Sequence, residues 1–156
     1  MSNRGFSKIE IIIVVFVILL FVAGDIFVSR YLAAKTRDVK VLSEVSEIRS
    51  GLELYSYLNN FYPQIAEPTT LNDSYVGTEK LCREGFERLS EKCTKVLMDK
   101  IPNFYYSEGN RYLYQAVNNY SDYLLEFNLE TDFPELQLTK GKKCATNLQI
   151  LNKSCY

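Results

Sequence analysis

The residues best equipped for chemistry in this chain are four cysteines and several acidic side chains. The chain has 156 residues and contains no histidine. This excludes Ser-His-Asp and Cys-His catalysis, and it excludes any zinc site with a histidine ligand. We find no other pairing of a nucleophile with a base, and therefore do not expect an enzyme.

The cysteines are spaced in two equal intervals: Cys82 and Cys93 are 11 positions apart, and so are Cys144 and Cys155. Four cysteines allow three connectivities. We favour the two local pairs because each would close a short loop, which stabilises a fold by roughly 2–3 kcal/mol. The C-x-x-C spacing of zinc sites is absent. Disulfides predict a folding unit outside the cytoplasm, with free thiols in a reducing compartment as the alternative.

A cluster of acidic residues near the C-terminal third could supply oxygen ligands. A calcium ion is a weak alternative here, because no D-x-[DN]-x-[DN]-G pattern is present and alternating acids on an exposed strand are ordinarily solvated. We expect no cofactor. The weak calcium candidates are Asp122, Glu126, Glu130 and Asp132.

Lysines without neighbouring acids gather around the last two cysteines. The whole chain has a net charge of −1, which argues against a general nucleic-acid-binding protein. We expect these side chains to be solvated, with contact to nucleic-acid phosphates as a weak alternative. The residues are Lys140, Lys142, Lys143 and Lys153.

A long apolar segment lies near the N-terminus. Residues 9–28 carry only two charges, Glu10 and Asp25, and residues 11–23 are unbroken apolar. A helix of this length spans about 30 Å, so the segment predicts a membrane span with the acids near its ends. Basic residues are more numerous after the segment than before it, which alone would place the N-terminus outside. The position of all four cysteines after the segment favours the opposite orientation.

The apolar pattern then becomes one-sided. Val41, Val45, Ile48, Leu52 and Tyr55 recur at spacings of 3 and 4, which places them on one face of a helix. Asparagines and a proline at residues 59–63 predict that the helix ends there. We therefore expect one helix from about Phe6 to Asn60.

The remaining residues predict a small α+β unit. The composition of residues 64–80 predicts a loop, and we expect residues 89–100 to form a short helix. Aromatic, alternating runs predict strands at 104–106, 112–117 and 123–130, joined by turns at 107–110 and 118–122. In the last strand Leu125, Phe127 and Leu129 should face the core, with Glu126, Asn128 and Glu130 facing water. The apolar face of the helix from Val41 to Tyr55, called the stripe below, is expected to pack against this antiparallel sheet in the core.

A short motif precedes the apolar helix: Arg4-Gly5-Phe6-Ser7-Lys8-Ile9-Glu10. It resembles the class III signal of type IV pilins and pseudopilins. The resemblance implies that a prepilin peptidase cleaves between Gly5 and Phe6 and methylates the new amino group of Phe6. It also implies a long N-terminal helix, membrane-spanning in its first half, packed on a small antiparallel β-sheet head. The implied division is a leader at 1–5, a membrane and assembly segment at 6–28, an amphipathic half at 29–62 and an extracytoplasmic head at 63–156.

In such a protein the function is assembly. The resemblance implies a precursor in the inner membrane that an assembly platform polymerises, with other pilin subunits, into a periplasmic or cell-surface filament. Glu10 would pair with the free amine of Phe6 of another subunit. The alternatives are a pseudopilin of a type II secretion system and a single-pass anchored binding domain that does not polymerise.

Overall fold

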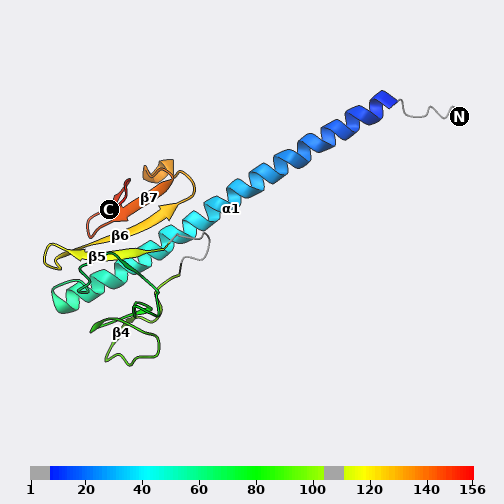
Figure 1. The fold of residues 1–156 in the computed structure, drawn as a ribbon. Coiled ribbons are helices and arrows are strands. Elements are labelled where there is room, and N and C mark those ends of the chain that lie inside the picture. Colours follow the sequence, from blue (N-terminus) through cyan, green and yellow to red (C-terminus); the bar gives the residue numbers. More distant parts are fainter. Residues whose placement is uncertain (1–7, 104–110) are drawn as a thin grey trace. The chain divides into compact units, whose positions relative to one another are not determined.

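The computed structural model describes residues 8–103 and 111–156, except for the side chains at positions 23, 26 and 27. The fold is α+β, with one long helix and two small antiparallel sheets (Figure 1). The chain divides into two compact units, Met1–Thr36 and Arg37–Tyr156. The expected fold class is confirmed at this level.

Helix α1 runs over Lys8–Asn59. Its end agrees with the prediction to within one residue, whereas Phe6 lies outside the described residues. The helix stops because Asn60 adopts a left-handed conformation with φ of 65°, and its N–H donates to the Ser56 carbonyl at 2.7 Å. This arrangement is typical of helix C-termini, and asparagine tolerates it better than most residues.

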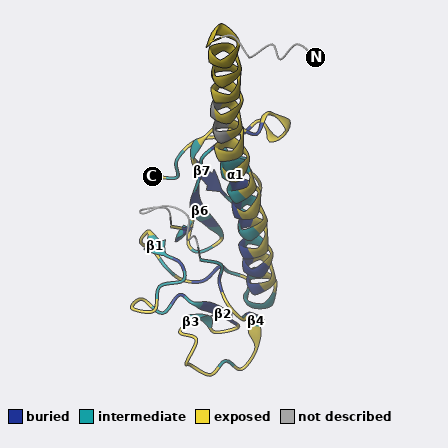
Figure 2. Ribbon diagram, turned by 90° about the vertical axis from the view of Figure 1, so that its right-hand side faces the viewer, coloured by how far each residue is buried: buried dark blue, intermediate teal, exposed yellow. Residues whose placement is uncertain are grey.

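The first half of α1 carries apolar side chains that are exposed (Figure 2, yellow). Because consecutive residues point in directions about 100° apart, the run from Ile11 to Val22 covers every side of the helix. Among the residues that the structure describes, no helix reaches the combined length and hydropathy needed to cross a membrane.

The larger sheet has five strands in the order β1-β5-β6-β7-β8. The central strand β6 pairs antiparallel with β5 and β7, so that Leu125 lies opposite Tyr114 on one side and Ala145 on the other. The five strands are β1 (Thr69–Thr70), β5 (Leu113–Val117), β6 (Asp122–Leu129), β7 (Gly141–Ala145) and β8 (Ile150–Leu151). A 3₁₀ turn, η1 (Pro134–Leu136), lies between β6 and β7.

The smaller sheet has three short strands in the order β3-β2-β4. They are β2 (Lys80–Cys82), β3 (Gly85–Glu87) and β4 (Val96–Met98). The predicted helix over 89–100 is therefore wrong. Its residues form turns and β4, because strand pairing with β2 and the nearby Cys82–Cys93 disulfide hold this segment in a tight hairpin-like loop.

The core forms where the second half of α1 meets the larger sheet. All five residues of the predicted stripe, from Val41 to Tyr55, are buried in one cluster with Tyr114, Leu125 and Phe127 of the sheet (Figure 2, dark blue). Burying each large apolar side chain contributes about 1.5–3 kcal/mol. The predicted core partnership between stripe and sheet is confirmed.

Two of the three predicted central strands are also confirmed, at 113–117 and 122–129. The turn between them is formed by Asn118, Asn119 and Tyr120, all with positive φ. The predicted strand 104–106 and turn 107–110 fall outside the described residues. The sequence did not reveal β1, which lies within the predicted loop 64–80, nor did it reveal β7, β8 or the smaller sheet.

Candidate functional site

The N-terminal segment offers a helix that is apolar on all sides with an acid in its first turn. Glu10 occupies that first turn. The predicted cleavage residues Gly5 and Phe6 lie outside the described residues. A helix of this composition is stable only where its apolar surface is withdrawn from water, either in lipid or against other helices. This segment is therefore the first candidate for an interaction site.

A buried carboxylate connects the start of the second unit to the end of β6. Asp38 is 0% exposed. Its two oxygens accept hydrogen bonds from the backbone N–H groups of Glu130 and Thr131, at 2.8 and 2.7 Å. The Thr131 hydroxyl donates a third bond at 2.6 Å. The N–H groups of Glu130 and Thr131 follow the last residue of β6, and the Asp38 side chain accepts hydrogen bonds from both. These bonds attach this end of β6 to α1.

The neighbouring residue adds an ion pair at the same place. Arg37 Nε donates to Glu130 Oε1 at 2.9 Å, and a second guanidinium nitrogen contacts the other carboxylate oxygen. Hydrogen bonding and the charge of Arg37 lower the pKa of Glu130. Paired bonds of this type are geometrically specific. One of the four calcium candidates is therefore already committed to a guanidinium.

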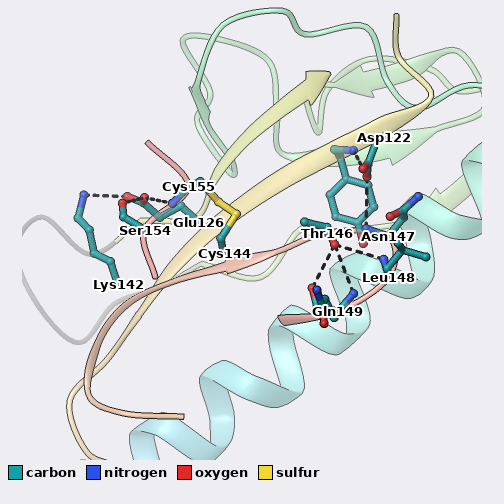
Figure 3. Close-up of a disulfide and its surroundings, with 11 residues drawn as sticks. Asp122, Glu126, Lys142, Cys144, Thr146, Asn147, Leu148, Gln149, Ser154 and Cys155 are labelled. Carbon is teal, nitrogen blue, oxygen red and sulfur yellow. Dashed lines mark hydrogen bonds and ion pairs between the residues drawn. A yellow bond between two sulfur atoms is a disulfide. The ribbon is translucent and has the colours of Figure 1, made fainter. Parts of the chain in front are cut away.

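The C-terminal strands are closed by the Cys144–Cys155 disulfide. Next to it, the Glu126 carboxylate accepts hydrogen bonds from Lys142 Nζ at 2.7 Å, from the Cys155 N–H at 3.1 Å and from the Ser154 hydroxyl. Figure 3 shows these groups converging on Glu126 beside the disulfide. The last residues of the chain are thus attached to the central strand both covalently and through a carboxylate.

Glu126 corrects one sequence expectation. The alternation in β6 predicts that this side chain faces water, but it is only 3% exposed. It lies opposite Cys144 in the sheet register and is covered by the C-terminal residues that the disulfide brings back. Burial by itself would raise the pKa of Glu126, but hydrogen bonds from Lys142, Ser154 and the Cys155 N–H outweigh it and lower the pKa.

The remaining calcium candidates also have protein partners. Asp122 accepts hydrogen bonds from the N–H groups of Tyr123 and Asn147, at 2.7 and 3.4 Å. Asp132 accepts one from the Lys140 N–H at 2.6 Å. Within residues 8–103 and 111–156, no group of three or more His, Cys, Asp or Glu side chains could hold a metal ion. The four acids are spread along β6 and its flanking turns rather than brought to one point.

The structure also separates the four lysines. Lys143 is 2% exposed, and its ammonium donates to the Lys142 carbonyl at 2.9 Å; burial lowers its pKa. Lys142 is paired with Glu126. Lys140 and Lys153 are exposed. A surface contact with phosphates would therefore have these two lysines as its principal cations.

Both cysteine pairs are the local ones: Cys82 is bonded to Cys93, and Cys144 to Cys155. No described cysteine is free. The disulfide framework therefore belongs entirely to the unit Arg37–Tyr156.

Sequence reasoning missed Asp38, although a signal was present. Asp38 lies three positions before Val41 and continues the spacing of the apolar stripe. An acid in phase with a buried face points to a buried hydrogen-bonding partner, because an isolated carboxylate is costly to bury. Its partners, the N–H groups after β6, could not be identified without the fold.

The molecule is an α+β protein with one long helix, whose first half is apolar and exposed and whose second half is covered by a sheet. A disulfide closes the C-terminal part of that sheet. Comparisons with protein-family models, with curated proteins and with solved structures found no match. The function is therefore inferred from the residues of this chain.

Proposed function

We propose that this chain is a structural subunit of a type IV pilus-like filament. It is made as a precursor in the inner membrane, with its C-terminal unit on the extracytoplasmic side. A prepilin peptidase cleaves it after Gly5 and methylates Phe6. An assembly platform then polymerises it through the first half of α1.

The observation that supports this proposal is the contrast between the two halves of one helix. The apolar residues of the second half are buried beneath the sheet, whereas those of the first half are exposed on every side. A subunit that polymerises through its N-terminal helix needs both properties. One half holds a folded unit, and the other supplies surface that packs against equivalent helices once it leaves lipid.

The membrane step depends on the sequence of residues 9–28, which carry only two acids in 20 positions. Extracytoplasmic placement is supported by the two disulfides of the C-terminal unit, because such bonds persist in oxidising compartments.

Glu10 has a defined role in this proposal. Its position in the first helical turn favours an anion by only about 0.3–1 kcal/mol, which is too little to compensate for placing a charge beside hydrocarbon. A positively charged partner would compensate. The freed amine of Phe6 on another subunit supplies that charge, and the pair would set the register between neighbouring helices.

Two measurements test the proposal. Mass spectrometry of the mature chain should find an N-terminal, methylated Phe6. An intact Met1, or a cut after the apolar segment, would contradict the proposal and favour a plain membrane anchor.

The second measurement compares Glu10→Ala with Glu47→Ala, an exposed acid on the second half of the same helix. Filaments sheared from cells and quantified by immunoblot should be lost or greatly reduced with the first change and unaffected by the second. Equal filament yields from both variants would contradict the assembly role of Glu10. Short periplasmic fibres that appear only when secretion genes are overexpressed would instead indicate the secretion pseudopilin.

A further inference from the structure

The C-terminal unit contains a groove of about 650 Å³. It lies between the segment that follows α1 and the start of β3, and it belongs entirely to the unit Arg37–Tyr156. Its volume is in the range of small-molecule sites. Nothing in the filament proposal uses this groove, so a ligand could bind there whether or not the chain polymerises.

Three aromatic side chains line the groove. They are Tyr55 of α1, Phe61 of the following segment and Phe86 of β3. The Tyr55 and Phe61 rings meet edge to face, with centroids 6.0 Å apart, and Phe86 meets Tyr114 in the same way at 5.2 Å. The packing fixes the orientation of these rings, so the groove is lined by preformed aromatic surface rather than by mobile side chains.

The Tyr55 hydroxyl makes no hydrogen bond to any residue that the structure describes, although Tyr55 is only 3% exposed. Asn147 Oδ1 is the one fully buried side-chain oxygen or nitrogen in the described residues without a partner. The Tyr55 oxygen must therefore retain some accessible surface. Tyr55 is also one of the residues that line the groove. A largely buried side chain of this site therefore keeps an unused hydrogen-bonding capacity.

The charges at the groove are all negative. Glu67 and Glu84 line it, and no basic side chain is found among its described lining residues. Hydrogen bonds from Thr94 lower the pKa of Glu84, so this carboxylate is ionised at neutral pH. Burial, with a contribution from the charge of Glu84, raises the pKa of Tyr55, and both residues line the groove.

We propose that this groove is a binding site for a small organic cation, a primary ammonium or guanidinium carried on a flat apolar body. The aromatic rings would contact the apolar body and the face of the cation. Glu67 and Glu84 would supply the counter-charge, and the Tyr55 hydroxyl would hydrogen-bond to the ligand. Anions of the same shape would bind more weakly, because the two carboxylates repel them.

The absence of tryptophan from the chain makes a direct test possible. Tryptamine can be excited selectively at 295 nm, and its fluorescence anisotropy can be followed as full-length protein in detergent is added. Indole-3-acetate, which has the same ring and the opposite charge, is the ligand control. We expect tryptamine to bind at least about 5-fold more tightly than indole-3-acetate, since exposed ion pairs change affinity by a few-fold each.

The matched variants are Glu67→Gln with Glu84→Gln, against Glu135→Gln, an exposed acid on η1 outside the groove. The double variant should weaken tryptamine binding about 5-fold and leave indole-3-acetate no weaker, whereas Glu135→Gln should change neither. Tyr55→Phe should weaken tryptamine binding by a smaller factor. Equal binding of both ligands, or unchanged tryptamine binding by the double variant, would overturn the proposal. The single Glu67→Gln change, at an exposed position, provides the same test if the double variant unfolds at a lower temperature.

Discussion

Asp38 and Thr131, 93 positions apart in the chain, are joined by two hydrogen bonds to one carboxylate oxygen, from the Thr131 N–H at 2.7 Å and from its hydroxyl at 2.6 Å. Asp38 is the first buried residue of the stripe along α1, and Thr131 follows the central strand of the larger sheet. This contact therefore sets where the sheet ends along the helix. The apolar stripe by itself would tolerate sliding, because hydrophobic contacts are not directional.

Replacing Asp38 by alanine should be among the most destabilising single changes in the C-terminal unit. It would leave the N–H groups of Glu130 and Thr131 without their acceptor in a buried place. Each such loss costs about 1–3 kcal/mol, so we expect a decrease of roughly 2–5 kcal/mol in the free energy of unfolding. Urea unfolding followed by circular dichroism measures it. Asp38→Asn should lose less because one acceptor oxygen persists, and an equal loss in the exposed control Asp99→Ala would contradict this account.

Acid should destabilise the unit through Glu126 and Glu130. Their pKa values in the folded protein lie below the ordinary value of 4.5. Their contribution to stability is therefore complete above about pH 4.5 and is lost as the pH falls through the lowered values. Urea midpoints measured between pH 7 and pH 2 should fall in this acidic window. The double variant Glu126→Gln with Glu130→Gln should be less stable at pH 7 and should show a shallower pH dependence. An identical slope would show that other carboxylates are responsible.

Alkali should act through buried tyrosines. Burial, with a hydrogen bond donated to Glu44 at 2.6 Å, raises the pKa of Tyr112 well above 10, and burial does the same for Tyr114. A raised pKa means that stability is retained below pH 10 and decreases as the pH rises further, because the unfolded chain ionises first. Absorbance at 295 nm should show some of the 12 tyrosines ionising only as the protein unfolds. If all twelve ionised in one transition near pH 10 with the fold intact, this interpretation would be wrong.

Gly51 should tolerate alanine but not leucine. A Cβ at this position would lie 2.7 Å from Met98 Cε and 3.5 Å from a Leu81 methyl group. The methionine end can rotate away, and alanine gains about 1 kcal/mol of helix propensity over glycine, so we expect Gly51→Ala to be close to neutral. Gly51→Leu should destabilise by about 1–3 kcal/mol, because it would force the helix and β4 apart. Thermal unfolding of the two variants compares them directly, and a leucine variant as stable as wild type would show that the helix does not pack closely on β4.

Features that repeat along the chain, or that depend on a few neighbouring residues, follow from the sequence alone. The spacing of Val41 to Tyr55 determined the buried face of α1, and alternation determined the inward residues of β6. The end of α1 near Asn60 was also predictable, because backbone preferences of asparagine and proline act over a few residues.

Contacts between groups that are far apart in the chain follow only from the folded structure. The alternation of its neighbours predicts that Glu126 faces solvent, but the disulfide brings the C-terminal residues back over this side chain and buries it. The sequence predicts a helix over residues 89–100, but the pairing of β4 with β2 outweighs a weak local helix preference. The groove lined by Tyr55, Phe61 and Phe86 likewise depends on segments that meet only in the folded unit. Such contacts depend on which distant segments pack together in the global fold. The pattern of neighbouring residue types reports local preferences and does not specify these contacts.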